Sequence, residues 1–394
     1  MMSAEHIPMS SPDLTDAERE AVAAVLKTPN LSMGSEIEAL ESGMRQYLGC
    51  KHAIAVNSGT AGLHLCVRAA GIGTGDLVLT TPFSFVASAN VLLFEQAVPV
   101  FIDVDPATGN IDPVTVSQAA RDLSQGGSAA RKWLPRKFPG TLAAFKAILP
   151  VDVFGQPADM DAILPTAQEF NLKVIEDSCE ALGAEYKGRR AGLLSEYGVF
   201  GFYPNKQITT GEGGLIVTED DQDAALMRAL RNQGRSPGDT WLQHTHLGYN
   251  YRLDEMSAAL GRVQLSRLDE MIAKRTVVAA MYMERLAEFS EIECLSISPN
   301  TSRMSWFVFV VRFAAHIDRD HIAVELKKYG IPARPYFTPI HLQPYMVERF
   351  DYRPGDFPVT EDLGRRSLAL PFSSMMKENQ VELVCSALSK ILGR

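Results

Sequence analysis

The stretch GFYPNKQITTGEGG, residues 201–214, places a single lysine, Lys206, between a proline–asparagine pair and a run of threonines and glycines. A nucleotide-binding P-loop has the order G-x-x-x-x-G-K-[ST], in which the glycines precede the lysine. Here the glycines follow Lys206, so a loop of that kind is excluded. The lysine needs another chemical explanation, and the surrounding segments supply one.

Apolar segments before and after this stretch alternate with amphipathic ones. Thr15 and Glu18 have capping-box spacing at the start of one helix, Ser35 and Glu38 at the start of the next, and Gly49 can end the second helix. Strands are expected within HAIAVN (52–57), LVLTTPFSFVASANVLLF (77–94), PVFIDVD (99–105), AAFKAILPVDVFG (143–155), LKVIEDS (172–178), YGVFGFY (197–203) and GGLIVTED (213–220). The alternation predicts an α/β fold, with a mostly parallel central sheet flanked by helices.

The pattern changes after about residue 260. Residues 261–289 predict one long amphipathic helix. The following elements are a strand in 305–313 and helices in 318–330 and 378–392. We therefore expect a large domain at 1–260 and a smaller C-terminal α+β domain at 261–394. Residues 121–141, RDLSQGGSAARKWLPRKFPGT, are polar and basic with little periodicity, and we interpret them as a surface loop.

Composition limits the classes of function. The 394 residues are 46% hydrophobic, enough for a sizeable core, and the formal net charge of −9 argues against a nucleic-acid partner. Five scattered cysteines without C-x-x-C spacing argue against a disulfide framework or a metal site and favour a cytoplasmic location. The N-terminal MMSAEHIPMSSPDL does not read as a signal peptide, and no apolar run is long enough for a membrane span.

Two segments carry polar residues where a strand meets a helix or a loop. In NSGTAG, residues 57–62, the amides of Gly59 and Thr60 and the hydroxyls of Ser58 and Thr60 can hold an anion at a helix N-terminus, although an ordinary N-cap is the commoner use. Asp177 ends the strand in VIEDS, at the edge where α/β sheets bind ligands. It could hold a cation or a protonated ring nitrogen, or simply cap a helix.

Three further segments are weaker signals. Phe85 follows a strand and could cover a flat ligand, although core packing is the commoner role of a phenylalanine. Asn250 lies in GYNYRLDEM, which is too polar for a routine core segment and could also be a surface turn. His341 lies in the proline-rich RPYFTPIHLQPY, where a lone histidine is more often a surface residue than a catalyst.

Together these residues fit one chemistry. A loop lysine can form an imine with an aldehyde cofactor, and an anion-binding turn can hold the phosphate of that cofactor. An aspartate can keep a pyridine nitrogen protonated while an aromatic ring covers the cofactor face. These are the parts of a pyridoxal 5'-phosphate (PLP) site, in which the ring acts as an electron sink.

The order of the motifs resembles that of the DegT/StrS-type sugar aminotransferases, a branch of the fold type I enzymes. The matching stretches cover nearly the whole chain: NSGTAGLHL, TPFSFVASAN, VFIDVD, LPVDVFGQPADMD, VIEDSCEALGAEYKG, FYPNKQITTGEGG, RNQGR, GYNYRLDEMSAALGRVQL and PARPYFTPIHLQPY. The resemblance implies a PLP enzyme that aminates a nucleotide-linked keto sugar, usually with glutamate as donor and as a homodimer with shared active sites.

Residue roles follow from the resemblance. Lys206 matches the lysine that forms the imine, and Asp177 matches the partner of the pyridine nitrogen. Gly59 and Thr60 match the phosphate-binding turn, together with the adjacent serine. Phe85 matches the aromatic residue that stacks on the ring.

The remaining positions include two departures from the family. Asn250 matches a residue that reaches the phosphate from the partner subunit, and Tyr203 and His341 are expected to border the substrate. Gly201 stands where many members have a serine that contacts the phosphate. Glu180 stands where many have His or Gln near the phenolic oxygen of the cofactor.

Two alternatives come from other classes of function. PLP-dependent sugar dehydratases of the same fold typically replace the lysine with histidine, so Lys206 argues against that reaction. A non-catalytic regulatory protein on the same scaffold would be expected to lose Lys206 or Asp177, and both are present.

Overall fold

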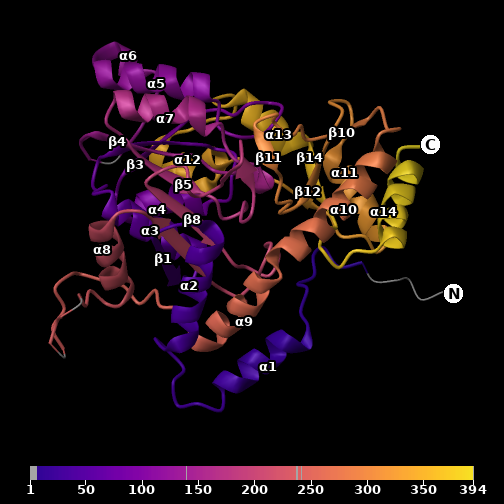
Figure 1. The fold of residues 1–394 in the computed structure, drawn as a ribbon. Coiled ribbons are helices and arrows are strands. Elements are labelled where there is room, and N and C mark those ends of the chain that lie inside the picture. The colour runs from indigo at the N-terminus through magenta and orange to yellow at the C-terminus, as the bar shows by residue number, and fades with distance from the viewer. Residues whose placement is uncertain (1–6, 139, 237, 241, 394) are drawn as a thin grey trace.

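The computed structural model describes residues 7–138, 140–236, 238–240 and 242–393. Residues 1–6, part of the N-terminal stretch analysed above, and residue 139 lie outside it. The described chain forms an α/β fold with a large central sheet and a separate smaller sheet near the C-terminus (Figure 1). Both the fold class and the mostly parallel sheet agree with the prediction.

The central sheet has seven strands in the order β1-β9-β8-β5-β4-β2-β3. The strands are β1 (His52–Val56), β2 (Leu77–Thr80), β3 (Val98–Phe101), β4 (Phe145–Leu149), β5 (Lys173–Asp177), β8 (Tyr197–Gly201) and β9 (Gly214–Thr218). Each lies within a segment for which the sequence predicts a strand, except that β3 begins one residue earlier than its segment. Strand β9 is antiparallel to both β1 and β8, and all other pairs are parallel, so six strands share one direction.

Helices cover both faces of this sheet. On one face, α3 and α8 share a core with apolar residues of six strands, including Ile54, Ile175 and Ile216. On the other face, α5 and α7 cover one end of the sheet and α2 and α9 cover the opposite end. The helices of this part are α1 (Asp16–Val25), α2 (Ser35–Leu48), α3 (Gly59–Ala69), α4 (Ala87–Phe94), α5 (Pro113–Gln125), α6 (Gly127–Arg131), α7 (Met160–Glu169), α8 (Asp221–Arg231) and α9 (Glu255–Ser266).

The smaller sheet is antiparallel, in the order β10-β12-β14-β13. Its elements and those around it are α10 (Leu268–Leu286), β10 (Ile292–Cys294), β12 (Phe309–Phe313), α11 (Arg319–Lys328), β13 (Arg334–Pro335), α12 (Pro344–Phe350), α13 (Pro358–Arg366), β14 (Ser367–Leu370) and α14 (Glu378–Ile391). Helices α10, α11 and α14 pack on this sheet around a core that also includes Ile7. A domain boundary near residue 260 stays a prediction. Ile7, at the start of the described chain, lies in the core of the C-terminal sheet.

Short elements complete the chain. The strands β6 (Glu185–Tyr186), β7 (Arg189–Arg190) and β11 (Thr301–Arg303) form a three-stranded sheet that links the two parts, and single 3₁₀ turns lie at Val153–Gly155 and Ile340–Leu342. No helix within the described ranges is long and apolar enough to cross a membrane. All five cysteines carry free thiols.

The start of α2 differs from the prediction. Gly34, not Ser35, is the N-cap residue, and the capping box expected there is absent. The buried Glu255 carboxylate instead accepts hydrogen bonds from the amides of Gly34 (2.9 Å), Glu36 (2.8 Å) and Ile37 (3.2 Å). A carboxylate accepts such bonds more strongly than a hydroxyl. A distant residue therefore replaced the local cap that the sequence suggested, whereas the box at Thr15 and the left-handed Gly49 are confirmed.

Two other segments also differ from expectation. The long helix expected at 261–289 is two helices, α9 and α10, because Arg267 has non-helical backbone angles and turns its side chain toward Asp13 and Glu18. Residues 121–141 are not simply a surface loop, because they include the end of α5 and all of α6. Trp133 donates to Asp122 at 2.8 Å and packs on the core. The glycine pair at 126–127 separates α5 from α6, so no continuous helical periodicity is visible in the sequence.

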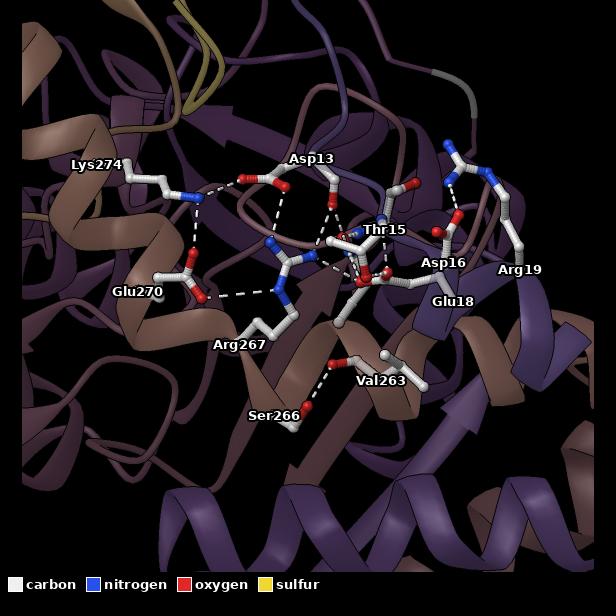
Figure 2. A network of polar contacts seen from close by, with 12 residues as sticks. Asp13, Thr15, Asp16, Glu18, Arg19, Val263, Ser266, Arg267, Glu270 and Lys274 are labelled. Carbon is white, nitrogen blue, oxygen red and sulfur yellow. Dashed lines mark hydrogen bonds and ion pairs between the residues drawn. The ribbon is translucent and has the colours of Figure 1, made fainter.

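A polar network joins α1 to the junction of α9 and α10 (Figure 2). Glu18, 1% exposed, accepts hydrogen bonds from the Thr15 amide (2.7 Å), Gln264 (2.8 Å) and Arg267 (2.9 Å). Burial opposes ionisation of Glu18, but the hydrogen bonds from Thr15, Gln264 and Arg267 outweigh it and lower the pKa to about 2. The ionised carboxylate therefore stabilises the folded state.

This network predicts a pH-dependent effect of Glu18→Gln. Because the pKa of Glu18 is lower in the folded chain than its ordinary 4.5, the stabilisation is complete above pH 4.5 and disappears as the pH falls toward 2. At pH 7 the substitution should lower the free energy of unfolding by about 2 kcal/mol, as for a hydrogen-bonded charge. Denaturant unfolding from pH 7 to pH 2.5 measures the loss, with exposed Glu20→Gln as control. An equal loss at both ends of the range would contradict the assignment.

Candidate active site

A cavity of about 660 Å³ lies where the carboxyl ends of neighbouring strands meet. Strands β5 and β8 are parallel neighbours that end at Asp177 and Gly201, and the turn from β1 into α3 lies beside them. The cavity brings together eight of the ten site residues expected from the sequence: Ser58, Gly59, Thr60, Phe85, Asp177, Glu180, Tyr203 and Lys206. Residues separated by up to 148 positions thus share one wall because parallel strands end at a common edge.

Asp177 is held in a fixed orientation at the base of the cavity. It is 4% exposed, and its Oδ2 accepts a hydrogen bond from the Ser88 hydroxyl at 2.7 Å. Its Oδ1 accepts from the Cys179 amide at 3.2 Å. Ser88 was not selected from the sequence, because a small polar residue in a helix carries no distinct signal. The two hydrogen bonds fix the carboxylate while leaving it able to accept another donor.

The turn that precedes α3 has the form of an anion site. Ser58 is the N-cap residue, and its hydroxyl accepts from the Ala61 amide at 3.0 Å. The Gly62 amide donates to the Ser58 carbonyl at 3.1 Å, so the amides of Gly59 and Thr60 lie before the helical hydrogen bonds begin. A Cβ on Gly59 would lie 2.7 Å from the sulfur of Cys179, so only glycine fits there.

Lys206 extends its amine into the cavity. Its Nζ lies 3.7 Å from Oε1 of Glu180 and 3.8 Å from the centroid of the Phe307 ring. The other carboxylate oxygen of Glu180 accepts from the Phe154 amide at 2.9 Å. Burial raises the pKa of Glu180, and the charge of Lys206 only partly opposes the effect. A protonated Glu180 can donate a hydrogen bond, as a histidine or glutamine would.

Two aromatic residues form the outer wall. Phe85 and Tyr203 line the cavity although their side chains are 64% and 53% exposed. Their exposed rings lie in the cavity wall, where a ligand can contact them. Phe85 is therefore not a core residue, which favours the ligand-covering role over the packing role.

Asn250 lies outside this cavity, on an exposed part of the chain. Its carbonyl accepts a hydrogen bond from the Asn57 side chain at 3.3 Å. Tyr249 and Tyr251, on either side of it, stack with their ring centroids 4.9 Å apart, and the Tyr251 hydroxyl lies 3.0 Å from Nδ1 of His64. The backbone around Asn250 is thus fixed, and its side chain is open to a second molecule.

His341 is also outside the cavity. It is fully buried, and its Nε2 lies 3.0 Å from the Glu361 carboxylate. The ring packs edge-on against Phe357, with 4.7 Å between centroids. Burial lowers the pKa of His341 despite the nearby Glu361. The structure therefore buries His341 outside the lining of this cavity, and its place beside the substrate stays a prediction.

Arg275 is a site-supporting residue that the sequence reading missed. Its guanidinium is 2% exposed and donates to the carbonyls of Lys206 (2.8 Å), Asn205 (3.4 Å), Trp306 (3.1 Å) and Phe307 (3.2 Å). Burial lowers the pKa of Arg275 to about 10, which leaves it charged at neutral pH. The sequence pattern could have identified Arg275, because this arginine falls at helical spacing among the apolar residues that form the buried face of α10.

The residues around the cavity fit PLP. The free amides in the first turn of α3 suit the phosphate, the Asp177 carboxylate suits a protonated ring nitrogen, and Phe85 can cover a flat ring. The Lys206 amine faces the same space, and the cavity is within the usual size for a cofactor and substrate.

Comparisons with known proteins agree with this assignment. Residues 12–389 match the model of the DegT/DnrJ/EryC1/StrS aminotransferase family. The chain is 36% identical to a GDP-perosamine synthase from Caulobacter vibrioides, with 100% of both chains covered. It is 34% identical to the spore coat polysaccharide biosynthesis protein SpsC from Bacillus subtilis, covering 98% of this chain and 97% of the relative. The crystal structure of S. venezuelae DesV superposes with a TM-score of 0.86 at 31% identity over 99% of each chain.

The fold and the site define a PLP-dependent enzyme of fold type I. The chain belongs to the DegT/DnrJ/EryC1/StrS aminotransferase family and is a PLP-dependent sugar aminotransferase.

Gly201 offers a test of the phosphate-binding turn. A Cβ at this position would lie 3.4–3.6 Å from atoms of Cys179, which is ordinary contact, and the residue adjoins Gly59. Gly201→Ser should fold normally and bind PLP about three- to tenfold more tightly, because the new hydroxyl can donate to the phosphate. Fluorescence titration with PLP measures the Kd. Gly201→Ala adds the same Cβ without the hydroxyl, so equal affinities of the two variants would place the phosphate elsewhere.

Proposed function

We propose that this chain transfers an amino group from glutamate to a keto sugar linked to a nucleotide, for the synthesis of amino sugars or surface polysaccharides. The single observation that carries the proposal is the Lys206 amine facing the same cavity as the fixed Asp177 carboxylate. Relatives named GDP-perosamine synthase and spore coat polysaccharide biosynthesis protein support the substrate class. The free thiols favour a reducing cytoplasm as the location.

The roles of the residues follow from their positions. When bound, PLP supplies a carbonyl that condenses with amines and a ring that accepts an electron pair. Asp177 would hold a proton on the ring nitrogen, and the amides of Gly59 and Thr60 would hold the phosphate. The Lys206 amine would move a proton between the cofactor and the substrate carbon that loses or gains the amino group. Glu180 lies close to that amine. In its protonated form it would donate a hydrogen bond to the phenolic oxygen of the cofactor.

An amination panel tests the proposal. Purified protein with PLP and glutamate should convert one or more nucleotide-linked keto sugars, GDP-linked sugars among them, to amino sugars, with one 2-oxoglutarate released for each. Lys206→Ala should lower the rate by about a hundred- to ten-thousandfold, the range for loss of a general acid–base group. Exposed Lys51→Ala is the matched control. Mass spectrometry of both products measures the reaction, and a Lys206→Ala variant with unchanged turnover would remove this lysine from the mechanism.

We further propose that two chains form a symmetric dimer with shared sites, in which Asn250 reaches the cofactor phosphate of the partner subunit. The support is the exposure of Asn250 outside the cavity of its own chain, on a backbone held by stacked tyrosines. An isologous interface would give two equivalent sites.

Mixed dimers test this arrangement. Lys206→Ala and Asn250→Ala, each of low activity alone, should regain activity when the two chains are co-expressed. One of the two sites then carries both defects and the other carries neither. Differential tags isolate the mixed dimer, which should have up to half the wild-type activity. If the tagged mixed dimer shows only the average activity of its two parents, Asn250 does not act across the interface.

A further inference from the structure

Arg334 is a charged residue of the cavity wall to which the proposed chemistry assigns no role. It forms the short strand β13 with Pro335, and its backbone pairs with Ala369 of β14. The C-terminal sheet therefore holds Arg334 beside the cavity. The residue is exposed and lines the cavity, so a ligand there can contact its guanidinium.

The Arg334 guanidinium has no hydrogen bond or ion pair with any residue that the structure describes. Two other arginines of the same sheet region differ in this respect. Arg312 on β12 binds the Glu293 carboxylate, and Arg366, which precedes β14, binds the Asp362 carboxylate. Arg334 thus keeps its N–H donors available to a ligand, and its positive charge has no counter-ion among the described residues.

The charged residues that line the cavity leave one cation without a task. Within the described chain, the Asp, Glu, Lys and Arg residues of the lining are Asp177, Glu180, Glu212, Lys206 and Arg334. In the proposed roles, the amides of the turn before α3 hold the cofactor phosphate and the Lys206 amine transfers a proton. Arg334 is then the only cation of the described lining that remains for an anionic group of a substrate.

Arg334 also lies near the reacting amine. Tyr336, two residues further along, lines the same cavity and packs edge-on against the Phe307 ring, with 6.2 Å between centroids. The Lys206 amine lies 3.8 Å from the centroid of that Phe307 ring. Burial raises the pKa of Tyr336 to about 12, the charge of Glu180 adds to the effect, and the charge of Arg334 opposes it. A substrate that reacts at the Lys206 amine can therefore extend to Arg334.

We propose that Arg334 binds an anionic group of the substrates, either a carboxylate of the amino donor or the phosphate groups that link the sugar to its nucleotide. The inference rests on the proposed function, because both substrates of that reaction carry such groups. A planar guanidinium matches the oxygens of a carboxylate or a phosphate with two parallel hydrogen bonds. Donor and acceptor occupy the cavity in turn, so one arginine can serve both.

Two unreactive probes test the inference without turnover. Glutarate carries two carboxylates and GDP carries a diphosphate, and neither can enter the amino-transfer reaction. Isothermal titration calorimetry of the full-length enzyme loaded with PLP measures the Kd of each probe. Arg334→Gln should weaken the binding of at least one probe about ten- to hundredfold, the effect of losing hydrogen bonds between charged groups.

Two further variants control the measurement. Arg334→Lys keeps the charge but not the planar fork, so its Kd should lie between those of the wild type and of Arg334→Gln. Arg365→Gln removes an exposed arginine of α13 that lies outside the cavity lining, and it should alter neither Kd. The absorption spectrum of bound PLP should be the same in all four proteins, because Arg334 is not assigned to the cofactor.

The probe that loses affinity identifies the anionic group. Weaker binding of glutarate assigns Arg334 to the amino donor, and weaker binding of GDP assigns it to the acceptor. Weaker binding of both assigns it to the two substrates in turn. Unchanged Kd values for both probes in Arg334→Gln would overturn the inference, as would a wild-type protein that binds neither probe at millimolar concentrations.

These outcomes are separate from those of the amination panel. If the wild type aminates no panel member but Arg334→Gln loses affinity for a probe, the proposed function fails and Arg334 still binds an anion in the cavity. If the wild type aminates a panel member and both Kd values are unchanged in Arg334→Gln, the function holds and the role of Arg334 fails.

Discussion

The position of Lys206 in the cavity depends on one buried cation. The Arg275 guanidinium donates to the carbonyls of Lys206 and Asn205 on one side and to those of Trp306 and Phe307 on the other. A buried charge is tolerated only when hydrogen bonds replace its hydration. The two backbone segments must therefore stay where these carbonyls converge. As a result the lysine amine lies 3.8 Å from the Phe307 ring and faces the cavity.

Helix α10, which carries Arg275, also supports the N-terminal side of the cavity. Arg267 precedes α10 and binds Asp13, next to Pro12 of the cavity wall, while Arg275 lies about two turns further along and binds the lysine loop. Helix α10 also packs on α14 of the C-terminal part. The helix thus connects the N-terminal segment and the lysine loop, which meet at the cavity, with α14 of the C-terminal part.

The two departures from the family pattern have different physical consequences. Gly201 places no side chain beside the turn at Gly59, so this turn offers an anion only its own amides and hydroxyls. Glu180 places a carboxyl group beside the lysine amine, and burial raises its pKa. A carboxyl group that holds its proton can donate a hydrogen bond, so it need not repel a negatively charged oxygen of the cofactor.

The sequence by itself determined the fold class, the seven strands of the central sheet and most of the cavity. These features rest on local periodicity and on the rule that parallel strands end at a common edge, which together place Asp177, Lys206 and the turn at Gly59 in one region. Only the tertiary structure decided that Glu255 caps α2, that Arg267 divides the long helix, that His341 is buried and that Ser10 reaches the cavity. Each of these depends on a contact between residues distant in sequence, or on the burial that such contacts produce, and local patterns contain no information about either.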